Sequence, residues 1–93
     1  MNKAEMIDAL AQNAGLNKKE AETALNAVLD TIRQTLARGE KLQLVGFGSF
    51  ETKQRAARKG RNPQTGEEID IAAAVIPVFK PGKQLKEAVN TEN

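Results

Sequence analysis

The chain has 93 residues, of which 40% are hydrophobic, and its formal net charge is +2. The absence of Cys and His excludes disulfides and thiolate metal sites, and removes the commonest general base and zinc ligand. No run approaches the ~20 apolar residues that span a bilayer, and the N-terminus lacks the layout of a secretory signal. We therefore expect a soluble, cytoplasmic, single-domain protein with no metal, cofactor, small-molecule substrate or membrane partner.

Two helices are predicted before residue 39. Asn2 and Glu5 form a capping-box pattern, and Gly15 fits the position after the end of the first helix. The pattern recurs at residues 17–20, where a second helix begins that ends at Gly39. This helix carries a broad apolar stripe made of Ala21, Ala24, Leu25, Val28, Leu29, Ile32 and Leu36. Because the link between the helices is so short, residues 1–39 are predicted to form a helical hairpin.

After residue 39 the periodicity becomes that of strands. Leu42 and Leu44 alternate with polar residues, which predicts a strand with one buried face. Residues 46–50 predict a tight turn, and a second strand runs from it into a basic segment. The chain returns through residues 69–79, where Pro77 fits an edge strand or a bend better than a central strand. We expect the sheet body over residues 40–52 and 75–82.

The last predicted element is a short helix. Pro81 and Gly82 end the returning strand, and the helix starts at residue 83. Its residues Leu85, Ala88 and Val89 are expected to face inward. We assign residues 83–93 to the C-terminal helix and tail.

Positive charge is concentrated in residues 52–66, which hold five basic residues and no acid. The remaining nine basic and twelve acidic residues give the rest of the chain a net charge of −3. A basic segment on an acidic body indicates a polyanionic partner bound at one place, although a charge run by itself is also common on a solvated loop. The five residues are Lys53, Arg55, Arg58, Lys59 and Arg61.

The basic segment is expected to belong to a β-hairpin arm over residues 53–74. Residues 62–66 (NPQTG) are a strong turn signal for its tip. The ten steps from Lys53 to Pro63 span about 33 Å, well beyond any core. An isolated two-stranded ribbon is only marginally stable in water, so we expect a tip that moves until a partner binds it.

A partner subunit is also expected. The apolar stripe of the second helix is too wide for a short helix and one small sheet to cover. Phe47, Phe50 and Phe79 have Gly and aliphatic neighbours rather than basic ones, which favours a core or dimer-interface role over base stacking. The partner is either an identical subunit or a paralogue.

Two motifs resemble the signature of the HU/IHF family of bacterial nucleoid proteins. They are Gly46-Phe47-Gly48-Ser49-Phe50 and, after Arg55 and Arg58, Gly60-Arg61-Asn62-Pro63-Gln64-Thr65-Gly66. The similarity extends from the Asn2-Lys3 opening to the Pro81-Gly82-Lys83 entry into the last helix. The resemblance implies an α+β fold: a helical hairpin, a three-stranded antiparallel sheet, a long β-ribbon arm and a short C-terminal helix in an intertwined dimer. It also implies two arms reaching around duplex DNA in the minor groove, in the bacterial nucleoid.

The arm holds most of the predicted DNA-binding residues. They are Lys53, Arg55, Arg58, Lys59, Arg61, Asn62 and Pro63. Along a strictly alternating strand Arg55, Lys59 and Arg61 would share one face, and phosphates line both flanks of a groove. In the family the proline at the tip wedges between base pairs. Pro63 suits that role because it is rigid and apolar and has no N–H donor.

Three lysines at helix ends are further candidates. Lys3 opens the first helix, and Asn26, where some family members carry an acid that can pair with it, leaves it free. Lys83 and Lys86 lie near the N-terminus of the last helix, where backbone N–H groups attract anions. Lys18 and Lys19 are expected to be solvated instead.

Three alternatives remain beside an HU-like function. An enzyme has the least support, because His, Cys and phosphate-binding glycine loops are absent. An RNA-binding protein lacks the exposed aromatics that RNA recognition commonly uses. A sequence-specific, IHF-like subunit would be expected to carry extra basic residues over residues 70–75. We therefore expect low-specificity binding that bends, compacts or stabilises DNA and prefers bent, nicked or gapped duplexes.

Overall fold

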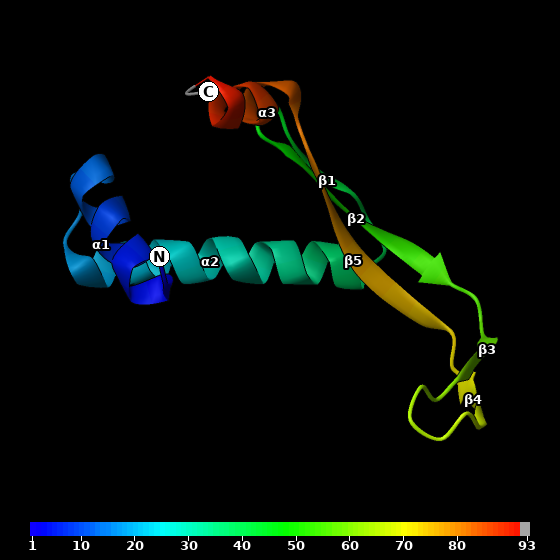
Figure 1. The fold of residues 1–93 in the computed structure, drawn as a ribbon. Helices are drawn as coiled ribbons and strands as arrows, with labels where there is room; N and C mark the ends of the chain where they lie inside the picture. The colour runs from blue at the N-terminus through cyan, green and yellow to red at the C-terminus, as the bar shows by residue number, and fades with distance from the viewer. Residues whose placement is uncertain (92–93) are drawn as a thin grey trace. The chain divides into compact units, whose positions relative to one another are not determined.

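The computed structural model describes residues 1–91 and has an α+β fold with antiparallel strands, as predicted (Figure 1). Residues 92–93 of the predicted tail lie outside the described residues. The elements are, in chain order, α1 (Lys3–Ala14), α2 (Lys18–Ala37), β1 (Leu42–Leu44), β2 (Gly48–Arg55), β3 (Arg58–Arg61), β4 (Glu68–Ile71), β5 (Ala74–Pro81) and α3 (Lys83–Asn90). The chain divides into two compact units, residues 1–35 and residues 36–93.

Both N-terminal helices, α1 and α2, begin at an asparagine cap. The Asn2 Oδ1 accepts a hydrogen bond from the Glu5 backbone N–H at 2.9 Å. At α2 the cap is reciprocal: Asn17 Oδ1 accepts from the Glu20 N–H at 2.8 Å, and Glu20 Oε1 accepts from the Asn17 N–H at 3.1 Å. Gly15, with φ of 68°, ends α1 in the left-handed conformation. The predicted boundaries of both helices are confirmed.

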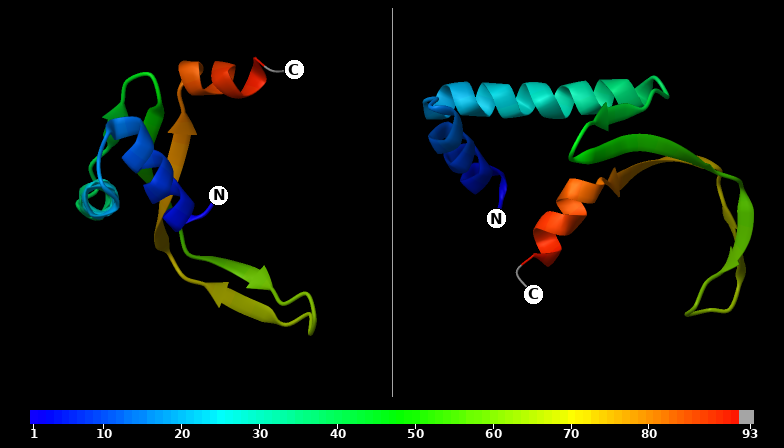
Figure 2. Two further views of the ribbon diagram at one scale, coloured as in Figure 1. Left: turned by 90° about the vertical axis from the view of Figure 1, so that its left-hand side faces the viewer. Right: turned by 90° about the horizontal axis from the view of Figure 1, so that it is seen from above.

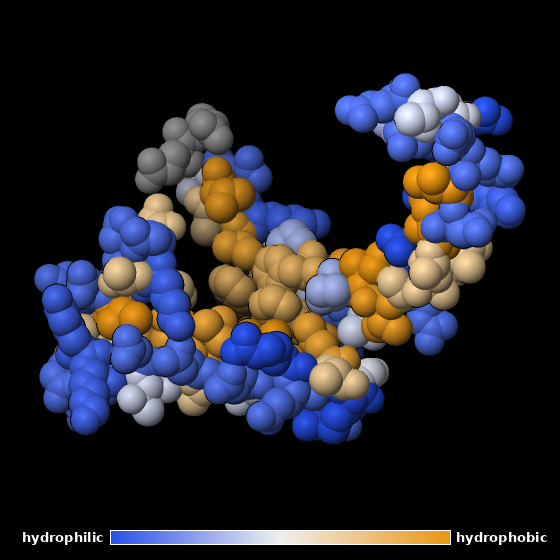
Figure 3. Space-filling model, turned by 90° about the horizontal axis from the view of Figure 1, so that it is seen from below, coloured by the Kyte–Doolittle hydropathy of each residue, from blue (hydrophilic) through white to orange (hydrophobic). Residues whose placement is uncertain are grey.

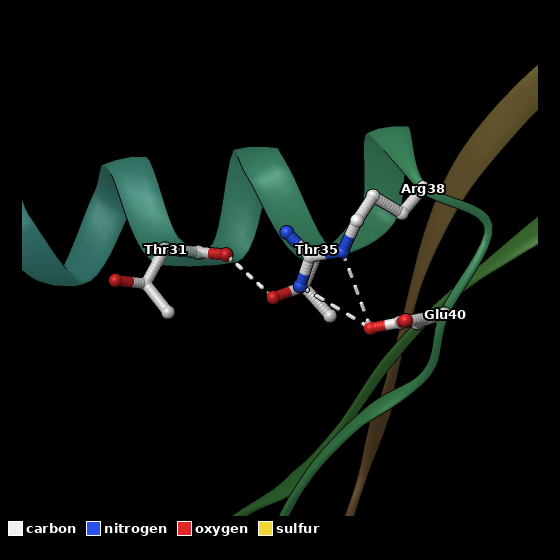
Figure 4. A network of polar contacts seen from close by, with 4 residues as sticks. All are labelled: Thr31, Thr35, Arg38 and Glu40. Carbon is white, nitrogen blue, oxygen red and sulfur yellow. Dashed lines mark hydrogen bonds and ion pairs between the residues drawn. The ribbon is translucent and has the colours of Figure 1, made fainter.

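The C-terminal end of α2 is held by local polar contacts (Figure 4). The buried Thr35 donates its hydroxyl hydrogen to the Thr31 carbonyl oxygen at 2.7 Å. Just beyond the helix, Arg38 forms an ion pair with Glu40 at 3.2 Å. Gly39 adopts φ of 77°, which lets the chain leave the helix where the sequence predicts.

The second unit contains a three-stranded antiparallel sheet in the order β1-β2-β5. Pro77 lies on β5 opposite Thr52, and β5 is an edge strand, as predicted. The turn between β1 and β2 covers residues 45–47 only, so the predicted turn over 46–50 was too long. Gly48 already belongs to β2, where a Cβ atom would lie 2.6 Å from the Lys80 carbonyl oxygen. Only glycine fits this close approach of two strands.

The three phenylalanines form one cluster on this sheet. The ring centroid of Phe79 lies 4.8 Å from that of Phe50 and 5.6 Å from that of Phe47. The cluster is poorly covered within one chain, because Phe47 remains 46% exposed and Phe79 38%. Leu44 is also exposed, so the predicted buried face of its strand is incomplete.

The face of α3 that was predicted to point inward is mostly exposed. Leu85 is half-buried, whereas Ala88 and Val89 are exposed, so this prediction was wrong for the single chain. Among the described residues, the buried hydrophobic side chains are those of Ala21 and Leu25. The fold therefore leaves much apolar surface open to solvent, which appears orange in Figure 3.

Candidate nucleic-acid interface

The arm consists of two short ladders rather than one continuous hairpin. The β2–β5 ladder ends at the pair Arg55 and Ala74, and the β3–β4 ladder begins at the pair Arg58 and Ile71. Residues 56–57 and 72–73, all alanine, interrupt both strands at the same level. The predicted β-ribbon arm is therefore present but interrupted, because alanine offers little side-chain packing to hold two isolated strands together. Figure 2 shows the change of direction of the ribbon at this break.

This break limits the predicted alternation to the outer ladder, where Lys59 and Arg61 share one face and Arg58 lies on the other. Arg55 belongs to one ladder, and Lys59 and Arg61 belong to the other. Strict alternation applies only within a ladder, so the face of Arg55 does not follow from that of Lys59.

The tip of the arm is a hydrogen-bonded turn built around Asn62. The Asn62 Oδ1 accepts from the Gln64 N–H at 2.9 Å, and its carbonyl oxygen accepts from the Gly66 N–H at 2.7 Å. Its own N–H donates to the Glu67 carbonyl oxygen at 2.8 Å. Pro63 follows directly and is exposed. Asn62 thus supports the turn that presents the rigid Pro63 ring.

Two arginines of the arm bind its own backbone. Arg55 Nη2 donates to the Ala72 carbonyl oxygen at 2.9 Å, beside the alanine break. Arg61 Nη1 donates to the Gly66 carbonyl oxygen at 3.1 Å, behind the tip. Both side chains remain exposed, so each guanidinium keeps further donors for another ligand. Sequence reasoning missed this bracing role, since the pattern does not fix how these side chains turn toward the backbone.

The returning side of the arm adds acids that lie outside the basic segment of residues 52–66. Glu67, Glu68 and Asp70 offset part of the positive charge, so residues 53–74 carry five basic and three acidic side chains, a net charge of +2. Asp70 Oδ1 lies 3.4 Å from Lys59 Nζ in a cross-strand ion pair. Folding the sequence back on itself about residues 62–66 would have revealed this pairing.

The outer ladder has one charged and one largely apolar face. Opposed residues of an antiparallel pair share a face, as do residues two apart on one strand. One face therefore carries Lys59, Arg61, Glu68 and Asp70, and the other carries Arg58, Gly60, Ile69 and Ile71. A Cβ atom on Gly60 would lie 2.8 Å from Ile71 Cδ1 and 3.8 Å from Ile69 Cγ1, which places both isoleucines over this glycine.

The base of the arm carries the candidate DNA-binding residue Lys53, and the adjoining sheet body holds an ion pair. Lys53 lies on β2 opposite Ile76 and is exposed, as its predicted role requires. Nearby, Lys80 Nζ lies 2.6 Å from Glu51 Oε1. This hydrogen bond, assisted by the charges of Lys80 and Lys41, lowers the pKa of Glu51 against the opposing effect of desolvation.

The candidate lysines outside the arm are all exposed at helix starts. Lys3 is the first residue of α1, as predicted. Lys83 is the first residue of α3, with Lys86 three residues later, and Lys83 Nζ lies 3.9 Å from Glu87 Oε1. Lys18 remains exposed, as expected, but it also forms an ion pair with Asp8 at 3.3 Å.

Two further features of residues 1–91 concern membranes and metal ions. None of the helices in this part of the chain is both long and apolar enough to cross a membrane. Within the same residues, no group of three or more Asp and Glu side chains is placed to hold a metal ion.

Comparisons with known proteins identify the family. A family described as bacterial DNA-binding protein matches residues 1–90. The chain is 60% identical over 89 residues to DNA-binding protein HU of Geobacillus stearothermophilus, covering 96% of this chain and 99% of that protein. It is 61% identical over 89 residues to HU of Staphylococcus aureus strain COL, with the same coverage.

Solved structures agree with these relatives. An Anabaena HU–DNA cocrystal structure matches with a TM-score of 0.90 at 48% identity and covers 97% of this chain and 98% of that one. HU from Thermotoga maritima matches with a TM-score of 0.68 at 42% identity, over 97% and 100% of the two chains. Since the family match, the relatives and the solved folds each span nearly its whole length, the chain belongs to the HU/IHF family of bacterial DNA-binding proteins.

Proposed function

We propose that this chain is a histone-like architectural protein that binds duplex DNA with low sequence specificity and bends it in the minor groove. One observation carries the proposal: a basic ribbon ends in a hydrogen-bonded turn that exposes the rigid ring of Pro63. Phosphate contacts supply affinity, and deformation of the duplex supplies preference among sites.

The cations of the arm and those in the first turns of α1 and α3 bind the phosphates. The arm contributes Lys53, Arg55, Arg58, Lys59 and Arg61, all of them exposed. As the DNA bends, its flanks approach Lys3, Lys83 and Lys86, each on the first turn of a helix whose dipole attracts anions. Asn62 holds the tip turn within the groove. Such contacts read charge and shape rather than base identity, as HU-like binding requires.

Bending is the role of Pro63. An apolar wedge between base pairs costs a few kcal/mol of stacking, which is repaid by the wider contact that bent DNA offers. A nick or a gap has already lost part of that stacking, so bent, nicked or gapped duplexes are the preferred ligands. Such a protein has no reaction to catalyse and works in the bacterial nucleoid.

A dimer provides the second arm and covers the open apolar surface. Val28, Leu29 and Val89 remain exposed in the single chain, together with the Phe47 and Phe79 rings. So much exposed apolar surface is unusual for a monomeric protein and marks an interface. The three phenylalanines lie at the core of that interface, formed with an identical subunit or a paralogue.

Competition binding tests the proposal against IHF-like binding and against generic basic adhesion. The competitors are a random linear duplex, the same duplex with a nick or a gap, and a chosen candidate sequence. HU-like function predicts that nicked and gapped duplexes compete best and that base sequence matters little. Preference for one intact sequence would instead indicate an IHF-like subunit. Equal competition by all the duplexes would indicate generic basic adhesion and contradict the proposal.

A further inference from the structure

We propose that Asp70 is a positioning residue that holds Lys59 away from DNA phosphates and so sets the salt dependence of binding. The inference deepens the proposed function and rests on it. Lys59 and Asp70 face each other in the β3–β4 ladder, with 3.4 Å between Nζ and Oδ1. This pairing satisfies one of the five cations of the arm before any ligand arrives.

The next pair along the same face provides an internal contrast. Arg61 lies opposite Glu68, yet its Nη1 is directed to the Gly66 carbonyl oxygen at 3.1 Å. Of these two acids, it is Asp70 whose carboxylate forms an ion pair with the cation opposite. Both acids lie on β4 and share a face, so they differ chiefly in whether they hold that cation.

The ion pair is exposed, with 67% of the Lys59 side chain and 85% of the Asp70 side chain accessible. Such a pair opens readily, and a phosphate can compete for the ammonium group. Opening the pair takes up part of the free energy that the phosphate contact would otherwise supply, so each arm neutralises fewer phosphates than its cations would allow.

The salt dependence of duplex binding measures this effect directly. An Asp70→Asn variant frees Lys59 while keeping a side chain of similar size. Each arm should then neutralise one more phosphate, which steepens the slope of log affinity against log salt by about 0.9. At about 0.1 M salt this corresponds to about eightfold tighter binding of a linear duplex per arm. Glu68→Gln removes the same charge from the same face and should leave the slope unchanged.

A double variant separates the ion pair from a general charge effect. In a Lys59→Gln background, Asp70→Asn should no longer steepen the slope, because the released cation is missing. Lys59→Gln alone should reduce the slope less than Arg58→Gln does, because Arg58 lies on the opposite face of the ladder from Asp70. Because Lys59→Gln leaves Asp70 intact, this comparison decides the matter if Asp70→Asn disturbs the arm.

Two results overturn the inference. Equal steepening in Asp70→Asn and Glu68→Gln would show that only net charge matters, and equal slope losses in Lys59→Gln and Arg58→Gln would show that Lys59 already reaches phosphate. Both leave the proposed function intact, because the parent slope is steep in either case. A parent chain whose duplex affinity does not fall with salt would overturn the proposed function, and the inference with it.

Discussion

At the scale of residues, several charged side chains of the second unit have a partner within the fold before any ligand is considered. Arg55 and Arg61 donate to carbonyl oxygens of the arm, and Lys80 binds Glu51 across the sheet. A cation that braces the ribbon and contacts phosphate has two roles, so its replacement should disturb both. The sequence predicted Arg55 and Arg61 as binding residues but not their hydrogen bonds to the backbone, which depend on side-chain conformation as well as on strand register.

The ion pair between Glu51 and Lys80 predicts a pH-dependent stability. The pKa of Glu51 is lowered, chiefly by the hydrogen bond from Lys80, below its ordinary value of 4.5. The contribution of the pair is therefore fully present above pH 4.5 and is lost as the pH falls through the folded-state pKa. In urea unfolding, Glu51→Gln should lower stability more at about pH 7 than at about pH 3.

Lys80→Gln provides the matched control for this pair. It should remove the same pH-dependent contribution, and the double variant should lose no more than either single variant in that range. A deficit of Glu51→Gln that stays constant between the two pH values would contradict the assignment.

At the scale of elements, local chemistry fixed some boundaries and packing fixed the others. The helix starts at Lys3 and Lys18 and the end at Gly15 follow from caps that act within a few residues, and the sequence predicted them. The alanine break in the arm and the exposure of Val89 on α3 were not predicted. Both depend on which surfaces meet in space, and periodicity along one chain does not contain that information.

The reciprocal cap of α2 predicts a measurable cost. Asn17→Ala loses the Oδ1 acceptor of the Glu20 N–H and should lower the free energy of unfolding by about 1 kcal/mol. Asn13→Ala, at an exposed position inside α1, is the control and should change it by less than about 0.5 kcal/mol. Urea melts at one protein concentration would compare them, and equal losses would show that the cap is not the cause.

At the scale of the whole molecule, the single chain does not bury an adequate core. Its buried hydrophobic residues within the described part of the chain are Ala21 and Leu25, while Phe47, Val75 and Val89 stay open to solvent. A small chain in this condition gains stability by oligomerisation. The wide apolar stripe on the second helix predicted that one chain would leave apolar surface uncovered. The exposed residues of the sheet add to that uncovered surface.

We therefore expect a stable dimer at micromolar concentration. Sedimentation equilibrium should give about twice the 10.1 kDa of one chain, and a folded 10.1 kDa species would reject the expectation. Phe50→Ala should abolish the folded dimer, because truncating a core Phe costs about 3–5 kcal/mol. Ile69→Ala, at an exposed position on the arm, should leave the dimer intact.

DNA bending by Pro63 is the most direct test of the account. Fluorescence energy transfer between the two ends of a short duplex reports how far the protein brings them together. The parent should raise the transfer, and Pro63→Ala should reduce it while linear binding survives with nearly the same salt slope, since Pro63 carries no charge. Gln64→Ala, the exposed neighbour at the tip, should bend DNA as the parent does. A Pro63→Ala variant that bends DNA as sharply as the parent would show that Pro63 only shapes the turn.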